Sequence, residues 1–514
     1  MNGAEPLTLP EGRITNYHTK SEVDEIGYVV PVGDGIARVY GSNRIYAGEP
    51  VEFAGGAKGT ASNPETDNVG VVLFGSDTAT REGDMVKRTG FTVDVPVGKA
   101  MLGRVVDASG VPIDGKGARR ADERRRVEAK APGIIARKSA HEPMETGLKA
   151  VDSPVPTGRG YYEPIIGDRQ TGKTAIAIDT IPNYKRINAQ GTSDSERSYR
   201  VHAAIGYKCL IVVYLVKIPP EAGVLEYRIT VAATAPDPAP PYFPAPHPGR
   251  ATGEYPRDNG MHASIIHDDP SKYPVAHCYT PSLSRRPPGR EASPGDVPHS
   301  HPRSSERAAK MSDRTGAGSS TASPAIETQA GDVPAHIPTN VIPTIDGYIP
   351  SETELLHRGI YSVINVGSPV PRVGSAAQSK AMKQVRGSSK PESAQYREVA
   401  ASAESGSDPD AATKYSSNCG ARPTEALKYP YYSPPPIEKE TVVTYAAVKG
   451  YSDEIPIPII EKHEYEPSKS IDPGILPSTA EEKSITEQIN SQPATSHKES
   501  TQSFPLFHGP RKRA

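Results

Sequence analysis

The sequence predicts an antiparallel β-barrel near the N-terminus, a central α/β domain built on a mostly parallel sheet, and a helical C-terminal region. Three observations support this prediction: short β-rich runs separated by Gly and Asp, a strand followed by a glycine-containing loop and a helix, and polar helix-like patches toward the end. A length of 514 residues leaves room for several domains.

The barrel is predicted for residues 26–95, after a polar N-terminal arm at residues 1–25. Residues 27–40 and 69–74 are rich in β-branched residues, and Gly and Asp interrupt the region at short intervals. Many short strands with such punctuation are typical of a small closed barrel.

The central domain is predicted for residues 96–380, where apolar runs alternate with helical stretches. Within it, residues 167–174 read Gly-Asp-Arg-Gln-Thr-Gly-Lys-Thr and fit the phosphate-binding pattern G-x-x-x-x-G-K-[ST]. A short apolar strand at 163–166 precedes this loop, although Pro164 suits the start of a strand better than its interior. An apolar segment at 175–180 follows as the start of a helix. The order of strand, loop and helix is the context that this motif requires.

The residue types in the loop point to phosphate chemistry. Glycines let the backbone curl so that several N–H groups converge on an anion. Lys173 supplies a cation for the terminal phosphates, and the Thr174 hydroxyl can ligate Mg²⁺. The N-terminal dipole of the following helix also favours negative charge. The loop therefore predicts a site for a magnesium–nucleotide complex.

A second element of this site is predicted at Asp268, which ends the apolar run Ile265-Ile-His. In phosphate-loop proteins, a carboxylate at the end of a buried strand holds Mg²⁺, often through water. We prefer Asp268 to Asp269 because it directly ends the run. His262 and His267 lie nearby without a third ligand at metal-binding spacing, so both are expected to be non-functional.

Charge and targeting signals exclude several classes of protein. The net charge of −2 argues against a general nucleic-acid-binding surface. No apolar run is long enough to predict a transmembrane helix, and the N-terminus has neither a secretory core nor an Arg-rich presequence. The three cysteines, Cys209, Cys278 and Cys419, lack metal-ligand spacing and are expected to be free thiols in a reducing compartment.

The composition is abnormal for a large globular protein. Proline occurs 53 times, phenylalanine only 6 times, and tryptophan is absent. A large enzyme normally fills its core with more large apolar side chains. The sequence resembles a globular protein from which leucine and phenylalanine have been partly removed.

With these residues in view, the sequence resembles the alpha subunit of the F-type ATP synthase, most closely the plant mitochondrial form. The likeness runs from about residue 13 to residue 450, and its motifs are specific in combination. Six stretches carry it: residues 30–38, 93–106, 167–180, 285–291, 327–333 and 372–378.

The resemblance implies an N-terminal β-barrel, a central phosphate-loop nucleotide-binding domain and, at 381–514, a C-terminal helical bundle. It implies a hexameric ring in which alpha and beta subunits alternate around a gamma subunit, joined to a peripheral stalk. The implied location is the matrix side of the mitochondrial inner membrane, peripheral to the bilayer; a plastid thylakoid or a bacterial plasma membrane is the alternative. No nucleic-acid partner is expected.

The resemblance also assigns roles to individual positions. Mg²⁺ with ATP or ADP would bind at a site that does not turn nucleotide over, with Thr174 and Asp268 at the metal. Arg372 would reach into the catalytic site of the neighbouring beta subunit as an arginine finger. The nucleotide-contacting residues would be Arg169, Gln170, Thr171, Gly172, Lys173, Thr174 and Ala175, with Tyr429 and Tyr431 standing where family glutamines contact the adenine.

The loop itself favours an alpha over a beta subunit, because its sequence, including Gln170, resembles the alpha version. A catalytic subunit also needs a carboxylate that orients the attacking water. The alpha family has glutamine at the corresponding position, and this protein has Tyr207. Neither side chain is a base at neutral pH.

Departures from the family follow a pattern. Many are single pyrimidine transitions in a codon: Leu is replaced by Pro or Ser, Tyr by His, Arg by Cys and Thr by Ile. Elsewhere Gln or Arg is replaced by Tyr, as it would be if stop codons had been rendered as tyrosine. The examples are Pro164, Pro182, Ser264, Pro270, Ser284, His267, His277, Cys209, Cys278 and Ile211, and Tyr at 28, 161, 162, 207, 214, 273, 279, 348, 361, 429 and 431.

We interpret the sequence as a conceptual translation of an organellar gene whose transcript is edited in both directions, C to U and U to C. A decaying pseudogene is the rival explanation. Because a helical proline costs about 3 kcal/mol and a lost buried leucine about 2–5 kcal/mol, the protein as written is expected to fold poorly.

Two other functional classes are alternatives. A hexameric nucleic-acid motor of the Rho type shares a barrel followed by a phosphate-loop domain, but it needs a basic, aromatic RNA-binding face. A degenerate product that enters no complex is the other alternative.

Overall fold

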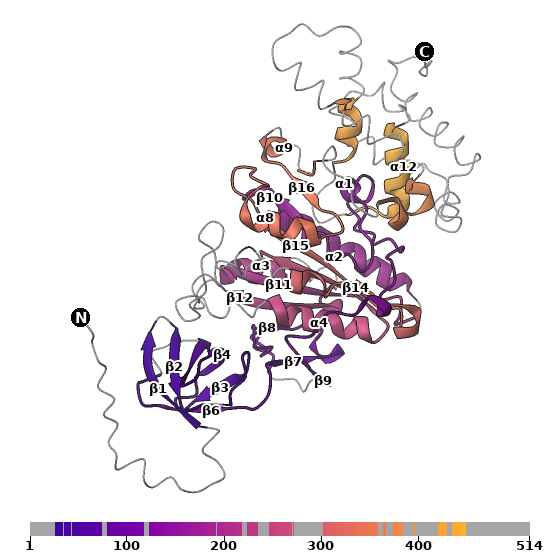
Figure 1. Ribbon diagram of the computed structural model, residues 1–514. Helices are drawn as coiled ribbons and strands as arrows, with labels where there is room; N and C mark the ends of the chain where they lie inside the picture. The colour runs from indigo at the N-terminus through magenta and orange to yellow at the C-terminus, as the bar shows by residue number, and fades with distance from the viewer. Residues whose placement is uncertain are drawn as a thin grey trace, which may run out of the picture.

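The computed structural model describes three regions of the protein: a small barrel, a central sheet with helices on both faces, and C-terminal helices (Figure 1). The described residues are 26–33, 35–42, 44–74, 80–117, 123–191, 193–217, 224–234, 246–269, 271, 302–357, 363–365, 374–383, 395–396, 420–428 and 434–448.

The N-terminal strands close into an antiparallel barrel, as predicted. Alternate side chains point inward, and Val39, Val51, Phe53 and Val71 are among the buried residues of its core. In the order in which they pair around the barrel, the strands are β1 (Ile26–Gly33), β2 (Ile36–Tyr40), β5 (Asn68–Phe74), β4 (Lys58–Pro64), β3 (Pro50–Phe53) and β6 (Met85–Arg88).

A two-stranded ribbon follows the barrel and packs against the central domain. It consists of β7 (Asp94–Val97) and β9 (Glu123–Arg126), which pair antiparallel. Val95 and Val97 pack with Ala251 of α4 (Pro246–Asp258). The ribbon therefore lies against the lower helical layer of the central domain in Figure 1.

The central sheet carries the phosphate loop, and its main strands run parallel, as the alternating pattern predicted. A short strand, β14 (Ala309–Lys310), pairs antiparallel with β15. From one edge to the other, the parallel strands are β16 (Ile349–Ser351), β10 (Ile165–Gly167), β15 (Ser319–Glu327), β13 (His262–Asp268), β11 (Ser198–Tyr207), β12 (Arg228–Thr234) and β8 (Val105–Val106).

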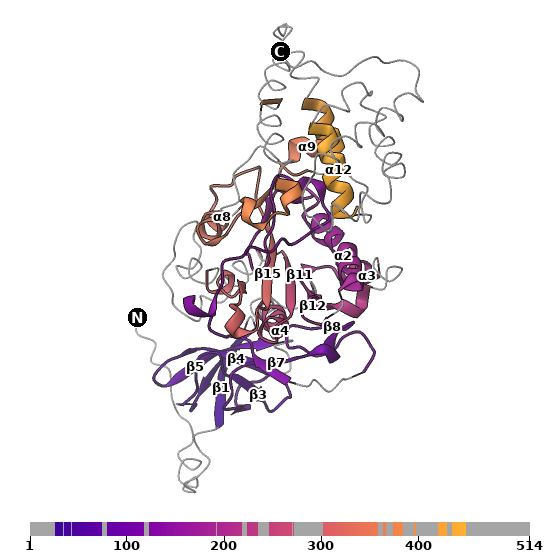
Figure 2. The same ribbon diagram turned by 90° about the vertical axis from the view of Figure 1, so that its right-hand side faces the viewer.

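Helices cover both faces of this sheet (Figures 1 and 2). The helices α2 (Lys173–Gln190) and α3 (Cys209–Lys217) lie on one face, and α4 lies on the other. Adjacent residues of β13 show the two directions: Ile265 packs beneath α4, whereas Ile266 packs with Ile176 and Ala177 of α2. A sheet covered on both faces is normally apolar on both.

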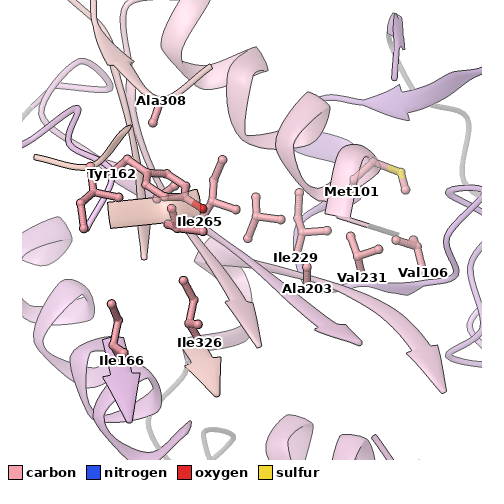
Figure 3. Packing of buried hydrophobic residues seen from close by; sticks show 14 residues of the cluster. Met101, Val106, Tyr162, Ile166, Ala203, Ile229, Val231, Ile265, Ala308 and Ile326 are labelled. Carbon is pink, nitrogen blue, oxygen red and sulfur yellow. The ribbon is translucent and has the colours of Figure 1, made fainter. Parts of the chain in front are cut away.

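The α4-facing side meets this expectation except at His267 and Ser320, which are buried polar residues (Figure 3). Its cluster includes Val201, Ile229, Ile265 and Ile326, all buried. Gly253 lets α4 approach closely, because a Cβ there would lie 2.5 Å from Cδ1 of Ile265. The fully buried members include no Leu or Phe, consistent with the unusual composition.

The α2-facing side does not meet the expectation. Its buried residues include Arg200, His202, Arg228 and Ser264, each at most 3% exposed. Alternation of polar and apolar residues along 198–207 would normally indicate a strand with one solvent face. Here the polar face is covered by α2 and α3 instead.

The remaining elements lie outside the central sheet, and the longest of them belongs to the C-terminal region. The helix α1 (Lys149–Asp152) contacts the C-terminal region, because Lys149 Nζ donates to the carbonyls of Ala426 and Lys428 at 3.1 and 3.2 Å. These elements are η4 (Lys99–Met101), η5 (Ile134–Ala136), α1 (Lys149–Asp152), η7 (Val224–Tyr227), η10 (Asp313–Thr315), α8 (His336–Val341), η11 (Ile342–Thr344), α9 (Thr353–His357), η12 (Gly374–Ala377) and α12 (Ile437–Val448).

Several local expectations can be compared with this arrangement. The strand before the loop begins at Ile165, directly after Pro164, which agrees with the preference of proline for strand starts. The predicted helix at 175–180 lies within α2, and α2 continues through Pro182 without a break. Among the described residues, no helix is long and apolar enough to cross a membrane.

Glu163 provides a prediction of pH dependence. Burial raises its pKa from 4.5 to about 8. Because the folded state favours the protonated acid, this group's contribution to stability is fully present below about pH 4.5 and is lost as the pH rises toward 8. Glu163→Gln is therefore expected to be more stable than the parent at pH 8, by roughly 1 kcal/mol or more, and to lose the advantage near pH 4. Urea unfolding at both pH values measures this, and an equal difference at both would contradict it.

Candidate functional site

The phosphate loop connects the end of β10 to the start of α2 and needs an unusual backbone. Gly172 has a φ of 76° and Gln170 a φ of 63°, both in the left-handed region. At Gly167, a Cβ would lie 1.8 Å from Oγ of Ser351 on the neighbouring strand β16. Glycine at 167 is therefore required by close packing, and glycine at 172 by the turn into the helix.

The side chain of Lys173 folds back over the phosphate loop. Its ammonium group donates hydrogen bonds to the carbonyls of Gly167 at 2.7 Å and Asp168 at 2.6 Å. A lysine ammonium has three donors, so these two bonds leave one for a ligand. Burial lowers the pKa of Lys173, and nearby Asp269 and Glu327 oppose this effect.

The first turn of α2 is open to an anion. Gly172, the residue that precedes Lys173, provides no side-chain cap for the helix. The first N–H groups of any helix have no partner within the helix, and they carry the positive end of its dipole. The loop and this helix end therefore provide backbone donors beside the Lys173 cation.

Side chains outside the motif hold the loop in place. Asp168 Oδ1 accepts hydrogen bonds from Thr328 Oγ1 at 2.6 Å and from Gly331 N at 2.8 Å. Thr171 Oγ1 lies 2.9 Å from Ser351 Oγ. Arg169 forms an ion pair with Glu327 at the end of β15. The turn after β15 and the strand β16 thus fix the loop from two sides.

The structure places Thr174 and Asp268 on either side of one hydroxyl group. Tyr207 OH donates to Asp268 Oδ1 at 2.9 Å and lies 3.1 Å from Thr174 Oγ1. Tyr207 ends β11, and Asp268 ends the adjacent parallel strand β13. The sequence-predicted metal residues are therefore brought to one edge of the sheet, next to Lys173.

These residues suit Mg²⁺, which prefers oxygen ligands and retains several waters. Asp268 is 1% exposed; its Oδ2 atom lies 3.9 Å from His202 Nε2 and accepts no hydrogen bond. Among the described residues, no cluster of three His, Cys, Asp or Glu side chains could hold a metal alone. The donor set fits a cation that is bound mainly through nucleotide phosphates and water.

Tyr207 also limits what the site can do. Burial, and then the Asp268 charge, raise the pKa of the Tyr207 phenol, so it remains protonated at neutral pH. A protonated phenol cannot take a proton from an attacking water. The residue at this position can bridge the metal ligands but cannot act as the general base.

Tyr207→Phe tests the bridge. Removing the hydroxyl frees Asp268 Oδ1 and the Thr174 hydroxyl for the metal, so Mg²⁺ is expected to support nucleotide binding at about tenfold lower concentration. Titration of nucleotide binding with Mg²⁺ measures the change. Tyr199→Phe, in the same strand, is the control and should leave the titration unchanged. If Tyr207→Phe needs the same Mg²⁺ concentration as the parent, or a higher one, the bridge does not compete with the metal.

Other predicted positions lie outside the described residues. These are Arg372, Tyr429 and Tyr431, together with Cys278 and Cys419; their roles stay predictions. Cys209 is described and is an exposed free thiol. His267 is buried with neither ring nitrogen hydrogen-bonded, and burial lowers its pKa, so it is neutral. It faces α4 rather than the metal residues, because a Cβ at Gly249 would lie 3.9 Å from its Cε1 atom.

Sequence reasoning missed the residues that support the loop. Asp168 stood out only as part of the motif, Thr328 only as part of the stretch 327–333, and Ser351 did not stand out at all. An Asp directly after the first glycine of the motif is the only local signal. The residues that it contacts follow a strand far along the sequence.

A barrel followed by a parallel sheet with this loop and an acidic strand end defines the class of phosphate-loop nucleotide-binding proteins. Three family models match this protein: the β-barrel domain of the ATP synthase alpha/beta family at residues 22–90, the nucleotide-binding domain of that family at 147–370, and the C-terminal domain of the ATP synthase alpha/beta chain at 378–502. Together they span most of the sequence, which belongs to the ATP synthase alpha/beta family.

Proposed function

We propose that the protein is the alpha-type subunit of a proton-translocating F-type ATP synthase, which binds Mg-ATP or Mg-ADP without hydrolysing it. The observation that carries this proposal is Tyr207 between Thr174 and Asp268. A catalytic subunit needs a carboxylate that orients water in this region, and a buried phenol does not provide one. The site therefore supports binding rather than turnover.

The proposal includes a ring of alternating alpha and beta subunits around gamma, held by a peripheral stalk. The proposed location is the matrix side of the mitochondrial inner membrane, where the subunit is attached through the complex. Arg372 is proposed to stabilise charge on the transferred phosphoryl group in the beta site, as arginine fingers do. The family assignment and the balanced charge of the protein support this role over an RNA-driven motor.

Co-expression with beta and gamma subunits tests the proposal. The tagged protein is expected to co-purify with both, to retain Mg-nucleotide, and to show no ATP hydrolysis when purified alone. Adding RNA to the isolated protein is the control and should not stimulate ATPase activity. RNA-stimulated hydrolysis by the isolated protein would favour a nucleic-acid motor. Failure to join beta and gamma, together with failure to bind nucleotide, would favour a non-functional product.

A further inference from the structure

The face of the central sheet that packs against α2 and α3 contains many polar residues, although it is buried. They lie on four neighbouring strands. Register places the residues of β11, β12, β13 and β15 side by side in this layer. Its polar members, all buried except the partly exposed last one, are Ser198, Arg200, His202, Arg228, Thr230, His262, Ser264, Ser319, Thr321 and Ser323.

Two arginines in this layer have no carboxylate partner among the described residues. Arg228 is 1% exposed and donates to the carbonyl of Leu215 at 3.1 Å and to His202 Nδ1 at 2.7 Å. Arg200 donates to the carbonyl of Ala177 and stacks on the Tyr184 ring at 4.3 Å. Burial, and then the Arg200 charge, lower the pKa of Arg228 to about 10. Two cations without a neutralising carboxylate thus lie close together in the core.

The same layer is underpacked. A void between α2 and the sheet is lined by Ser264, Ser323 and Arg200, together with apolar residues such as Ile176 and Ile266. Ser264 Oγ is buried and has no hydrogen-bond partner. A larger apolar side chain at 264 would fill space that the hydroxymethyl group leaves open.

The types of misplaced residue are restricted. Between the strand ends, the polar residues of this layer are only Arg, His, Ser and Thr; Lys, Asn, Gln, Asp and Glu do not occur there among the described residues. In the genetic code, a single C-to-T exchange in the codon converts each of these four types to an apolar or less polar residue. Arg becomes Cys, His becomes Tyr, Ser becomes Leu or Phe, and Thr becomes Ile or Met.

On the surface, the reverse is found: apolar residues occupy exposed positions. Cys209, Leu210 and Ile211 begin α3, and Leu210 is 78% exposed. A single T-to-C exchange in the codon converts each of them to a polar residue or proline. Cys becomes Arg, Leu becomes Ser or Pro, and Ile becomes Thr. The departures in this buried layer and those in this exposed segment therefore run in opposite directions.

We propose that the working polypeptide differs from the encoded sequence at these positions: cysteine at 200 and 228, tyrosine at 202, leucine at 264, arginine at 209, serine or proline at 210, and threonine at 211. This inference rests on the proposed function, because only a protein with a working role must keep its core. It extends pyrimidine exchange to positions 200, 202, 210 and 228. Arg200 contacts α2, Arg228 contacts α3 and His202, and Leu210 is exposed to solvent.

Peptide mass spectrometry of the native subunit, together with sequencing of its transcript, tests the inference. The expected peptides carry the restored residues at 200, 202, 228 and 264, and the transcript differs from the gene at the matching codons. Native peptides with Arg at 200 and 228 would overturn it. If such a subunit still joined beta and gamma and bound Mg-nucleotide, this inference would fail and the proposed function would stand. If the restored peptides came from a protein that joins no such complex, the inference would stand and the proposed function would fail.

A recombinant comparison provides a second measurement. The combined variant Arg200→Cys, His202→Tyr, Arg228→Cys and Ser264→Leu is expected to raise the unfolding midpoint by about 10 °C or more. The matched control exchanges the exposed Arg126 and Arg314 for Cys, which should leave the midpoint nearly unchanged. A combined variant no more stable than the parent would contradict the inference.

Discussion

Lys173→Gln is expected to weaken ATP binding at least about 100-fold. Its ammonium group bonds to two carbonyls of the loop, at 2.6 and 2.7 Å, and lies beside the uncapped start of α2. A charge-assisted hydrogen bond in a partly buried site contributes about 1.5–3 kcal/mol, and the loss of the phosphate-facing charge adds to this. Equilibrium titration with a fluorescent ATP analogue measures the affinity.

Lys185→Gln is the matched control, because Lys185 lies on the same helix and is exposed. It should bind the analogue as the parent does. The two variants should also unfold at similar temperatures without nucleotide, so that a difference in affinity reports on the site. Equal affinities in both variants would mean that the loop does not bind phosphate.

Arg228→Cys is expected to raise the free energy of unfolding by up to about 4 kcal/mol, the upper end of the range found when a buried ion pair is replaced by apolar residues of similar volume. The guanidinium is 1% exposed and faces a carbonyl and a neutral imidazole rather than a carboxylate. Cysteine removes the charge and restores a small residue that is commonly buried. Urea unfolding at pH 7 in reducing buffer measures the change.

Arg314→Cys controls for the loss of one arginine, because Arg314 is exposed. Its effect should stay within about 0.5 kcal/mol, as for most surface substitutions. A destabilised Arg228→Cys variant would show that the buried guanidinium contributes favourable interactions to the core. The polar layer would then be a feature of the working protein.

The phosphate loop and its setting could be predicted from the sequence because they are local. Gly167, Gly172, Lys173 and Thr174 lie within one motif, and the strand and helix beside it are short apolar runs. Asp268 could be placed because parallel strands bring their carboxyl ends to one edge of the sheet. The barrel followed in the same way from closely spaced turns.

The contacts that complete the site could not be predicted, because they join distant segments. Tyr207 stood out as a replacement, but only the register of β11 and β13 places its hydroxyl between Thr174 and Asp268. The bond from Thr328 to Asp168 depends on the position of β15 in the sheet. Side-chain distances across a sheet are set by strand order and register, which local patterns do not specify.

The polar layer beneath α2 was also beyond sequence reasoning. Periodicity along β11 indicates one polar face, but it does not reveal that a helix covers that face. Comparison with a family drew attention to Ser264 and His267, whereas Arg200 and Arg228 became conspicuous only when their burial and their neighbours were known. Tertiary packing decides whether a polar residue in a strand is ordinary or misplaced.

The central claim is that Thr174 and Asp268 hold a metal beside a nucleotide bound by the loop. Pulsed electron paramagnetic resonance with Mn²⁺ in place of Mg²⁺ tests it most directly. With ATP, the account predicts ³¹P hyperfine coupling to Mn²⁺ in the parent protein, and loss of the bound Mn²⁺–ATP signal in Thr174→Val and Asp268→Asn. An identical coupling in the parent and in both variants would contradict the account.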